Sequence, residues 1–363
     1  MEHLQAFGER RERLLVALGA LRPARADAFL TTAPPNVRYL TGFTGSNGAV
    51  LLSAERAVLF TDPRYATQAP LESDCEVKIG KGALVKEIAA LVKRLRLKSL
   101  AFESNRVSYE EHAQLKEALP GVRLKPVTGT VETLRMVKSE EEIGTIRASV
   151  QLNSAALEHA LEQFRPDMTE VDLAAEIEYR MRCLGADGTS FDTIVASGEH
   201  SALPHAHPTD HPINPDQLLL IDMGANVAGY ASDMTRTYAV GKLDAKIRRM
   251  YRAVLESQLA AIDAVKPGAS CASVDRAARA VLRGYGMDQF FIHSTGHGLG
   301  LEIHERPRLG RKEMTKLEAG MAITIEPGVY QEGLGGVRIE DTVIVTATGC
   351  EILTPTGKEL VVL

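Results

Sequence analysis

The sequence predicts two domains, an α/β domain followed by an α+β domain. Three observations lead to this fold class. The 363 residues exceed the usual size of one domain. Short apolar runs alternate with amphipathic segments over residues 1–130, whereas residues 131–363 combine long helical segments with glycine-rich strand pairs. The hydrophobic fraction of 45% and charged fraction of 25% are typical of a soluble globular protein. We therefore expect domains at 1–130 and 131–363.

In the first domain, the pattern predicts an alternation of strands and helices. Strands are expected at 27–32, 56–61, 98–102 and 122–127, and helices at 3–20, 83–96 and 109–119. The segment PPNVRYLTGFTGSNGAVLLS has paired prolines and a glycine-rich run, which predict a loop between strands. The alternation indicates a mixed or parallel sheet covered by helices. Neither GxGxxG nor GxxxxGK[ST] occurs, so nucleotide binding has no support.

In the second domain, helix starts are marked by capping residues. The boundary is expected near residues 127–138. Ser139 is the expected N-cap of a long helix, with Glu142 as its capping-box partner, and Thr169 with Asp172 marks a second helix. Two more helices are expected at 244–264 and 273–284, before a strand-rich C-terminal third.

Composition argues against several classes of function. The net charge of −5 argues against a nucleic-acid binder. The four cysteines form no CxxC pair, as expected for reduced thiols of a cytoplasmic protein. The N-terminus carries acids and arginines where a signal peptide needs an apolar core. No apolar run approaches the roughly 20 residues that span a bilayer. We therefore expect a cytoplasmic protein that binds neither nucleic acid nor membranes.

Residues 217–238 form a strand, a glycine-containing turn and a second strand, and each strand carries one aspartate. A hairpin symmetric about its turn places Asp222 directly opposite Asp233, with Cβ atoms roughly 5 Å apart. Two like charges beside an apolar run destabilise a fold, and a buried carboxylate is costly unless it is paired or bound to a metal. This strand pair therefore predicts a divalent cation.

A second strand pair, at residues 320–345, repeats the arrangement with glutamates. Glu326 and Glu340 lie symmetrically about residue 333 and are expected to face each other, whereas Asp341 points to the opposite face of its strand. Between the two strand pairs, the segment HSTGHGLGLEIHE holds His297 among three glycines. Four carboxylates and one imidazole then make an oxygen-rich set of five ligands.

The charge of this set predicts two metal ions. One divalent ion leaves excess negative charge, whereas two ions balance the four carboxylates and favour a dinuclear site with a bridging water. Mostly hard oxygen ligands with one nitrogen suit Mn²⁺, Co²⁺ or Zn²⁺, while structural zinc sites prefer thiolates. Among these three ions we expect Mn²⁺.

Five segments of the chain carry a family resemblance. In this order, LLLIDMGA, YASDMTRT, STGHGLGLEIHE, TIEPGVY and GVRIEDTV resemble the five metal motifs of the pita-bread metallopeptidases, and most closely their proline-specific branch, aminopeptidase P and prolidase. The segment NVRYLTGFTGSNGAVLL is similar to a creatinase-type N-terminal domain, so the resemblance covers essentially the whole chain. It implies Asp222, Asp233, His297, Glu326 and Glu340 as metal ligands, with Asp233 and Glu340 bridging two ions.

The resemblance also implies roles for other residues. His205 resembles a loop histidine that approaches the substrate near the scissile bond, and His304 resembles one that hydrogen-bonds the substrate carbonyl oxygen. Arg308 and Arg338 fall where the family keeps a basic residue near the site. Phe191 resembles an apolar wall for the proline ring. From the residues alone, the alternatives are that Arg308 and Arg338 are ordinary ion-pair partners of Glu305 and Asp341, and that His205 belongs to a solvated loop.

The implied reaction is metal-assisted hydrolysis of the bond before proline. Two ions supply a bridging hydroxide at neutral pH. Glu326 is the expected group that takes the proton of the water and passes it to the proline nitrogen. That nitrogen carries no hydrogen in the peptide, so it must be protonated in order to leave.

The lead hypothesis is an aminopeptidase P that cleaves Xaa-Pro bonds at the N-terminus of proline-containing peptides. Small prolidases tend to carry an insertion after the YLTGF-like stretch, whereas here YLTGF continues directly as TGSNGAVLL. A prolidase restricted to dipeptides is the alternative. A non-catalytic pita-bread binding module is an alternative of another class, but such modules have typically lost metal ligands and this chain keeps all five. The resemblance also implies a homodimer.

Overall fold

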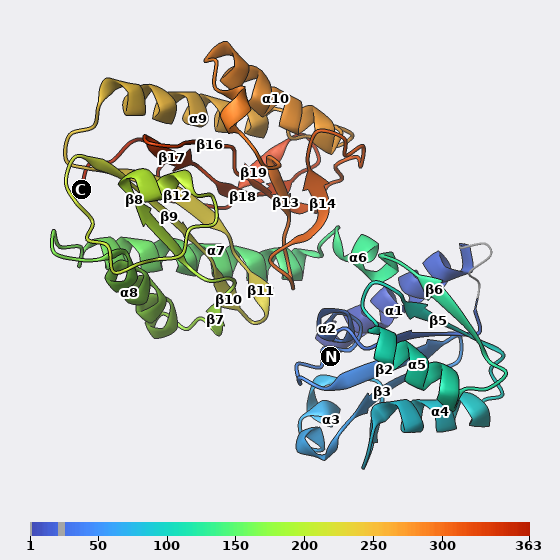
Figure 1. Cartoon of the computed structure of the whole chain (residues 1–363). Helices are drawn as coiled ribbons and strands as arrows, with labels where there is room; N and C mark the ends of the chain where they lie inside the picture. Colours follow the sequence, from blue (N-terminus) through green and yellow to red (C-terminus); the bar gives the residue numbers. More distant parts are fainter. Residues whose placement is uncertain (1, 21–25) are drawn as a thin grey trace. The chain divides into compact units, whose positions relative to one another are not determined.

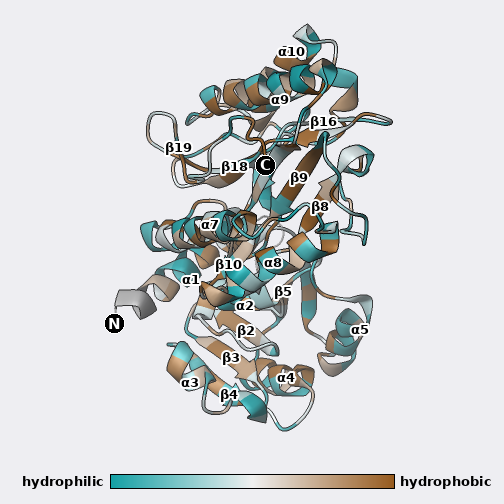
Figure 2. Cartoon of the chain, turned by 90° about the vertical axis from the view of Figure 1, so that its left-hand side faces the viewer, coloured by the Kyte–Doolittle hydropathy of each residue, from teal (hydrophilic) through white to brown (hydrophobic). Residues whose placement is uncertain are grey.

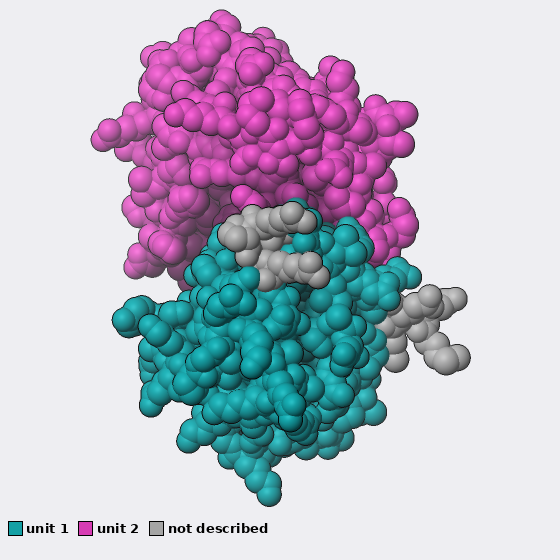
Figure 3. All heavy atoms as spheres, turned by 90° about the vertical axis from the view of Figure 1, so that its right-hand side faces the viewer, with its two compact units in different colours: residues 1–135 teal, residues 136–363 magenta. Residues whose placement is uncertain are grey.

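The computed structural model describes residues 2–20 and 26–363. It divides into two compact units, Met1–Arg135 and Met136–Leu363, which Figure 3 shows in separate colours. Within the described residues, every helix is too short or too polar to cross a membrane.

The first unit is built on a six-stranded mixed sheet with the strand order β4-β3-β2-β1-β5-β6 (Figure 1). Strands β1 with β5, β5 with β6 and β3 with β4 pair in parallel, while β2 is antiparallel to both β1 and β3. The elements are α1 (Glu2–Ala20), β1 (Ala28–Thr31), α2 (Pro34–Thr41), β2 (Gly48–Ser53), β3 (Ala57–Thr61), α3 (Ala69–Glu72), β4 (Glu76–Ile79), α4 (Leu84–Arg94), β5 (Ser99–Glu103), α5 (Tyr109–Ala118), β6 (Arg123–Val127) and α6 (Thr130–Arg135).

Helices cover both faces of this sheet because the strands bury apolar residues on both sides. On one face, Leu51 and Phe60 pack with residues of α4 and α5. On the other face, Val50 and Leu59 pack with Val37 of α2. The mixed sheet covered by helices that the sequence predicts is therefore present.

The paired prolines were expected to lie in a loop, and that prediction is wrong. They begin helix α2 instead. Proline is well tolerated in the first helical turn, where its missing N–H has no intrahelical partner to lose. Gly42 ends the helix in the left-handed conformation with φ +82°, and its N–H donates to the carbonyl of Arg38. The loop is thus confined to the short segment between α2 and β2.

The second unit combines two helix pairs with antiparallel strands. Its elements are α7 (Glu140–Leu161), α8 (Glu170–Cys183), β7 (Gly188–Thr189), β8 (Ile194–Ser197), η2 (Gly198–Ala202), β9 (Gln217–Met223), β10 (Ala225–Val227), β11 (Tyr230–Ala231), β12 (Met234–Val240), α9 (Ala245–Asp263), α10 (Cys271–Gly284), η3 (Asp288–Phe290), β13 (Gly296–Gly298), β14 (Glu305–Leu309), β15 (Ala322–Ile325), β16 (Gly328–Gln331), β17 (Gly335–Arg338), β18 (Asp341–Val345) and β19 (Cys350–Ile352).

The strands lie between the two helix pairs, with α9 and α10 on one side and α7 and α8 on the other (Figure 1). One core joins α9 and α10 to β15, β16, β17 and β18. A second core joins α7 and α8 to β9 and β12. Figure 2 shows β9 as largely hydrophobic, while α8 and α9 are of mixed hydropathy. The strand-rich layer is therefore buried on both sides, as the α+β prediction requires.

Both expected capping boxes are present. The hydroxyl of Ser139 accepts from the N–H of Glu142, whose carboxylate accepts from the N–H of Ser139. Thr169 and Asp172 make the same reciprocal pair at the start of α8. Each pair satisfies two donors that a helix N-terminus otherwise leaves unpaired.

The register of the first strand pair differs from the symmetric hairpin. Across β9 and β12, Asp222 is opposite Thr235, and Asp233 lies just before β12. The chain between these strands forms its own small hairpin from β10 and β11, which turns at Ala228 and Gly229, both with positive φ. This hairpin keeps the register of β9 and β12, since Asn226 is opposite Ala231 and Val227 is opposite Tyr230. The turn at Ala228 and Gly229 is thus centred one residue later than the symmetric prediction assumed. The direct opposition of Asp222 and Asp233 was therefore wrong.

The register of the second strand pair agrees with the symmetric one. Ile325 pairs with Asp341 across β15 and β18, and Gly328 pairs with Arg338 across β16 and β17. Glu326 and Glu340 lie at the break between these two ladders. The same register on both sides of the break puts the two glutamates across from each other.

Candidate metal centre

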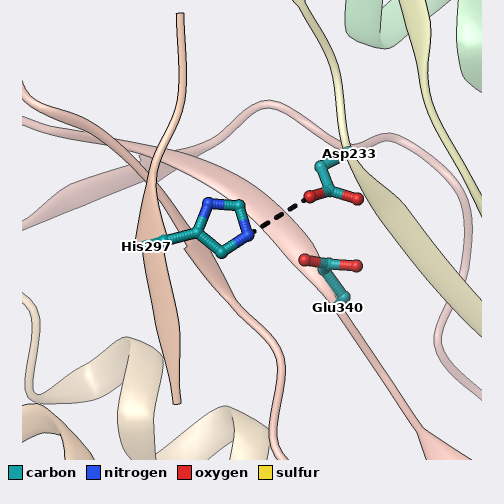
Figure 4. A group of neighbouring side chains, drawn as sticks. All are labelled: Asp233, His297 and Glu340. Atoms are coloured by element: carbon teal, nitrogen blue, oxygen red, sulfur yellow. Dashed lines mark ion pairs between the residues drawn. The ribbon is translucent and has the colours of Figure 1, made fainter. Parts of the chain in front are cut away.

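Three of the expected ligands converge in the second unit. One ligand atom each from Asp233, His297 and Glu340 lies within 4.8 Å of the other two. Figure 4 shows both carboxylates turned toward the imidazole, and His297 Nε2 is 3.4 Å from Asp233 Oδ2. The three residues come from the segment before β12, from β13, and from the junction of β17 with β18.

The backbone holds these segments together. Glu340 donates its N–H to the carbonyl of Thr235 over 3.1 Å, and Glu326 donates its N–H to the carbonyl of Thr295 over 2.8 Å. Gly296 packs so tightly that a Cβ there would come within 1.9 Å of the carbonyl oxygen of Thr324. The glycine next to His297 is therefore required for the close approach of β13 and β15.

Glu326 lies beside the same imidazole. Its Oε1 is 3.6 Å from His297 Nε2, and its Oε2 is 3.9 Å from His293 Nδ1. The structure therefore brings Glu326 next to the cluster of three. His293 donates from Nδ1 to the carbonyl of Ser294, which leaves its Nε2 to accept from the hydroxyl of Tyr330.

Asp222 is held by an arginine. Arg338 Nη2 donates to Asp222 Oδ2 over 2.6 Å, its Nη1 donates to the hydroxyl of Tyr330 over 2.6 Å, and its Nε donates to Thr235 Oγ1. The other carboxylate oxygen of Asp222 is buried and has no hydrogen-bond partner among the described residues. A buried carboxylate oxygen without a donor is the arrangement expected where a cation binds.

The electrostatics of the acids also fit divalent cations. Burial raises the pKa of Asp233 well above its usual value, and repulsion from Asp222 and Glu326 raises it further. Burial and the neighbouring Asp233 and Glu326 likewise raise the pKa of Glu340 well above its ordinary range. Burial also raises the pKa of Glu326. Several carboxylates that repel one another in a buried space are stabilised by positive charge between them, so the residues present fit divalent ions.

Two more of the expected residues lie near this cluster. The rings of His297 and His304 stack edge to face, with centroids 4.5 Å apart. Burial and the neighbouring His297 and His205 lower the pKa of His304 below its usual value. His205 is exposed on the loop between η2 and β9, and it also lowers the pKa of His293. Both candidate substrate histidines therefore lie on the same side as the cluster.

The loop of His205 is fixed by a residue that the sequence did not reveal. Glu170, at the first turn of α8, is fully buried. Its carboxylate accepts from the N–H and hydroxyl of Ser197, from the N–H and hydroxyl of Thr209, and from His200 Nδ1. His200 is half-buried through this contact. The only sequence feature that marks Glu170 is its place directly after the N-cap residue Thr169, and acidic residues are common at helix starts, so this feature does not indicate a buried role.

Arg308 and Arg338 adjoin the cluster, whereas Phe191 is placed by its contact with Gly224, the residue that follows β9. The ring of Phe191 packs so closely on Gly224 that a Cβ on that glycine would come within 2.7 Å of the ring. Arg308 is paired with His297 across β13 and β14, and its Nε donates to Ser294 Oγ.

In the described part of the chain, the two acids that the sequence offered to these arginines pair with other cations, and Arg338 pairs with Asp222. Glu305 pairs with Lys138, and Asp341 pairs with Arg236 and Lys358.

Comparison with known proteins gives two family matches. Residues 144–347 match the family described as Metallopeptidase family M24. Residues 10–137 match the family described as Creatinase/Prolidase N-terminal domain. Together these matches cover both units.

Relatives match along nearly the whole chain. An Xaa-Pro dipeptidase of Pyrococcus horikoshii is 38% identical over 92% of this chain and 94% of its own length. The structure of an Xaa-Pro dipeptidase from Bacillus anthracis is 41% identical with a TM-score of 0.95, covering 98% of this chain and 100% of that chain. The structure of an X-Pro aminopeptidase from Thermotoga maritima is 36% identical with a TM-score of 0.90, over the same shares of both chains.

Proposed function

Because the chain belongs to metallopeptidase family M24 and carries a Creatinase/Prolidase N-terminal domain, we propose that it hydrolyses the Xaa-Pro bond at the N-terminus of short peptides. One observation carries this proposal: buried carboxylates that repel one another converge on His297, beside a second histidine that can contact a substrate. Relatives named for Xaa-Pro cleavage support the choice of substrate.

We propose that Asp222, Asp233, His297, Glu326 and Glu340 together hold two divalent ions. The four carboxylates of this set balance two such ions in charge. The oxygen-rich donor set favours Mn²⁺, with Co²⁺ and Zn²⁺ as alternatives. Asp222 belongs to this set because its unpartnered oxygen needs a positive neighbour, even though its other oxygen binds Arg338. When bound, the ions supply a Lewis acid for the scissile carbonyl and a hydroxide nucleophile at neutral pH.

The side chains then orient the peptide and move one proton. Glu326 lies 3.6 Å from His297 and is the group that would first accept a proton from the attacking water and then deliver it to the proline nitrogen. His304 has a lowered pKa and is therefore neutral near pH 7, so that its ring N–H can donate to the substrate carbonyl oxygen. His205 approaches the same bond from its loop. Phe191 offers an apolar surface for the proline ring.

Peptide length separates two forms of this activity. The uninterrupted run from YLTGF to TGSNGAVLL favours the aminopeptidase P type. A prolidase restricted to dipeptides fits the relatives at least as well, since two of the three compared above are named Xaa-Pro dipeptidase. We propose that the chain accepts both an Xaa-Pro dipeptide and Xaa-Pro-Xaa tripeptides.

The test uses the full chain, stripped of metal with a chelator and reloaded with Mn²⁺, Co²⁺ or Zn²⁺. We expect hydrolysis of Ala-Pro and Ala-Pro-Gly only after reloading, with two ions bound per chain by elemental analysis. Cleavage of Ala-Pro alone would replace the aminopeptidase P assignment with the dipeptidase one. An absence of cleavage of either peptide with every ion would refute the proposed function.

Ligand variants test the proposed centre directly. Asp233→Asn is expected to lower the number of bound ions and to reduce kcat by at least about a hundredfold, since even changes behind metal ligands cost tenfold to a hundredfold. Asp167→Asn is the matched control, because Asp167 is exposed and lies between α7 and α8, outside the segments that carry the cluster. Full metal content in Asp233→Asn would exclude Asp233 as a ligand.

We also propose a homodimer. Sedimentation velocity of the full chain tests this directly, and a single monomeric species at micromolar concentration would contradict it.

A further inference from the structure

A cavity of roughly 590 Å³ lies beside the candidate metal centre. His293 and Arg308 both line it. His293 is 3.9 Å from Glu326, and Arg308 is paired with His297 across β13 and β14, so their side chains lie on the same face. The cavity therefore begins at the centre itself. Its volume is within the range of roughly 300–1,000 Å³ that is common for small-molecule sites.

The wall of this cavity continues past the end of β14. After Leu309 the chain turns at Gly310, and Arg311 and Lys312 line the cavity next. Gln289 and Ile292 line it as well, and the Ile292 side chain is exposed. The lining thus offers an apolar contact, an amide and two flexible cations.

The positive charge of the lining is not balanced. Among the residues that the structure describes, no carboxylate oxygen forms an ion pair with Arg308, Arg311 or Lys312. Arg279 also lines the cavity, but its charge is balanced by an ion pair in which Arg279 Nε lies 2.8 Å from Asp275 Oδ2.

The acidic side chain of the lining has partners of its own. Glu313 accepts from the N–H and hydroxyl of Thr315, and these hydrogen bonds lower its pKa. The charge of Arg308 also acts on Glu326, whereas Arg311 and Lys312 have only this hydrogen-bonded carboxylate beside them in the lining, so the cavity is suited to an anion.

We propose that this cavity is a subsite for a carboxylate on the C-terminal side of the proline, and that Arg311 and Lys312 bind that carboxylate. The proposal rests on the proposed function. An extended peptide advances about 3.3–3.6 Å per residue, so a carboxylate one or two residues beyond proline needs a subsite roughly 3–7 Å further along than the proline. The carboxylate is either the C-terminus of a short peptide or an acidic side chain. The subsite thus selects short or acidic peptides.

The kinetic test compares three substrates with the metal-loaded full chain. They are Ala-Pro-Gly with a free C-terminus, its C-terminal amide, and Ala-Pro-Asp as the amide. We expect kcat/KM to be about tenfold higher for the free acid than for the amide, mainly through KM, as two partly exposed ion pairs can supply. If an acidic side chain serves equally, Ala-Pro-Asp amide recovers most of the difference. High salt should reduce the advantage by screening.

The variant test removes the two cations. Arg311→Gln/Lys312→Gln is expected to reduce the preference for the free acid to about twofold or less, while kcat for the amide is unchanged. Arg276→Gln/Lys316→Gln is the matched control, since it removes one exposed arginine and one exposed lysine that do not line the cavity. This control should keep the full preference. Equal kcat/KM for acid and amide in the wild type would overturn the proposal.

A binding measurement separates the subsite from the reaction. Analogues of the same three peptides with a reduced Xaa-Pro bond are titrated by calorimetry. We expect tighter binding of the acid by wild type and by the control, and equal binding of acid and amide by the double variant. If the wild type cleaves no Xaa-Pro peptide, the proposed function fails, yet these titrations still decide the subsite. Equal affinity of the wild type for acid and amide analogues would refute it.

Discussion

Glu170 fixes the loop of His205 through one buried carboxylate. It binds the chain on both sides of His205, at Ser197 before the loop and at Thr209 within it. Burial alone would raise its pKa, but hydrogen bonds from Ser197, His200 and Thr209 lower it, so the carboxylate is charged at neutral pH. Under the role proposed for His205, Glu170 would act as a positioning residue.

Glu170→Gln tests this role. In this variant, an NH₂ group replaces one carboxylate oxygen and faces the N–H and hydroxyl donors of Ser197 or Thr209, which then lack an acceptor. We therefore expect the free energy of unfolding to fall by about 2 kcal/mol. At a temperature where the variant is still folded, we expect a raised KM or lowered kcat for Ala-Pro-Gly with unchanged metal content. Glu178→Gln, on an exposed position of the same helix, is the control. Unchanged kinetics in the folded variant would contradict the positioning role.

Glu103, in the first unit, is buried without a cationic partner in direct contact. Its carboxyl group bonds with the hydroxyl of Thr31 and accepts from Asn36 Nδ2. Burial raises its pKa to about 7. An acid whose pKa is raised in the folded state binds a proton on folding. Stability is therefore highest below the unfolded pKa of about 4.5 and falls as the pH rises toward 7.

The predicted loss for the first unit is about 3 kcal/mol between pH 4.5 and 7.5. Hydrogen exchange of amides in β1 and β5 measures it. Glu103→Gln mimics the protonated acid, and we expect it to remove this pH dependence and to stabilise the unit at pH 8. Glu72→Gln, at a more exposed position of the same unit, is the control and should retain the pH dependence of stability. A wild type whose exchange shows no such pH dependence would contradict the prediction.

At the residue scale, the sequence predicted the identity of the side chains in the cluster better than the strand register that brings them together. Charge pairing selected Asp233, His297 and Glu340, which the structure brings together. It placed Asp222 wrongly, because the register of a strand pair depends on the turn, and this turn is centred between Ala228 and Gly229, one residue later than the symmetric hairpin assumed. The contacts of Glu170 depend on where a loop packs in three dimensions, and no local pattern encodes that.

At the scale of elements, adding a Cβ has opposite effects on stability at two glycines, Gly296 and Gly144. Gly296, in β13, has the carbonyl of Thr324 where a Cβ would lie. Gly144 lies in the middle of α7, and a Cβ there would meet nothing within 4 Å. One glycine is required by close packing of strands, whereas the other only loosens a helix.

Gly296→Ala is expected to separate β13 from β15 and to lower the free energy of unfolding by several kcal/mol, about 3 or more. Gly144→Ala is the control of opposite sign and should raise it by about 0.5–1 kcal/mol. Denaturant unfolding of the two variants measures both changes. A Gly296→Ala protein as stable as the wild type would show that the strands can separate at little cost.

Element starts were well predicted where a local capping chemistry marks them. The boxes at Ser139 and Thr169 are confirmed. Helix α2 was missed because prolines also begin loops, and only the packing of Val37 and its neighbours on the sheet shows that the chain continues as a helix. Short strands such as β10 and β11 were missed because so few residues carry no periodic pattern.

At the scale of the molecule, the second unit contains its own cores. Both clusters that surround the strand layer consist of residues after Arg135. All five proposed ligands also belong to this unit. We therefore expect a fragment of residues 136–363 to unfold cooperatively and to bind divalent ions in the full chain's stoichiometry. Calorimetry with Mn²⁺ measures binding. A fragment without a cooperative transition would show that the first unit is needed for folding.

The junctions that carry Asp233, Glu326 and Glu340 have a consequence for assembly. Each junction ends one ladder and starts another, and its backbone is bonded to a distant strand. Contacts between residues so far apart along the chain form late, since they close large loops. High-affinity uptake of the ions must await the docking of every strand. The absorbance of bound Co²⁺ would thus report the rate of the last folding step, in which these strands dock.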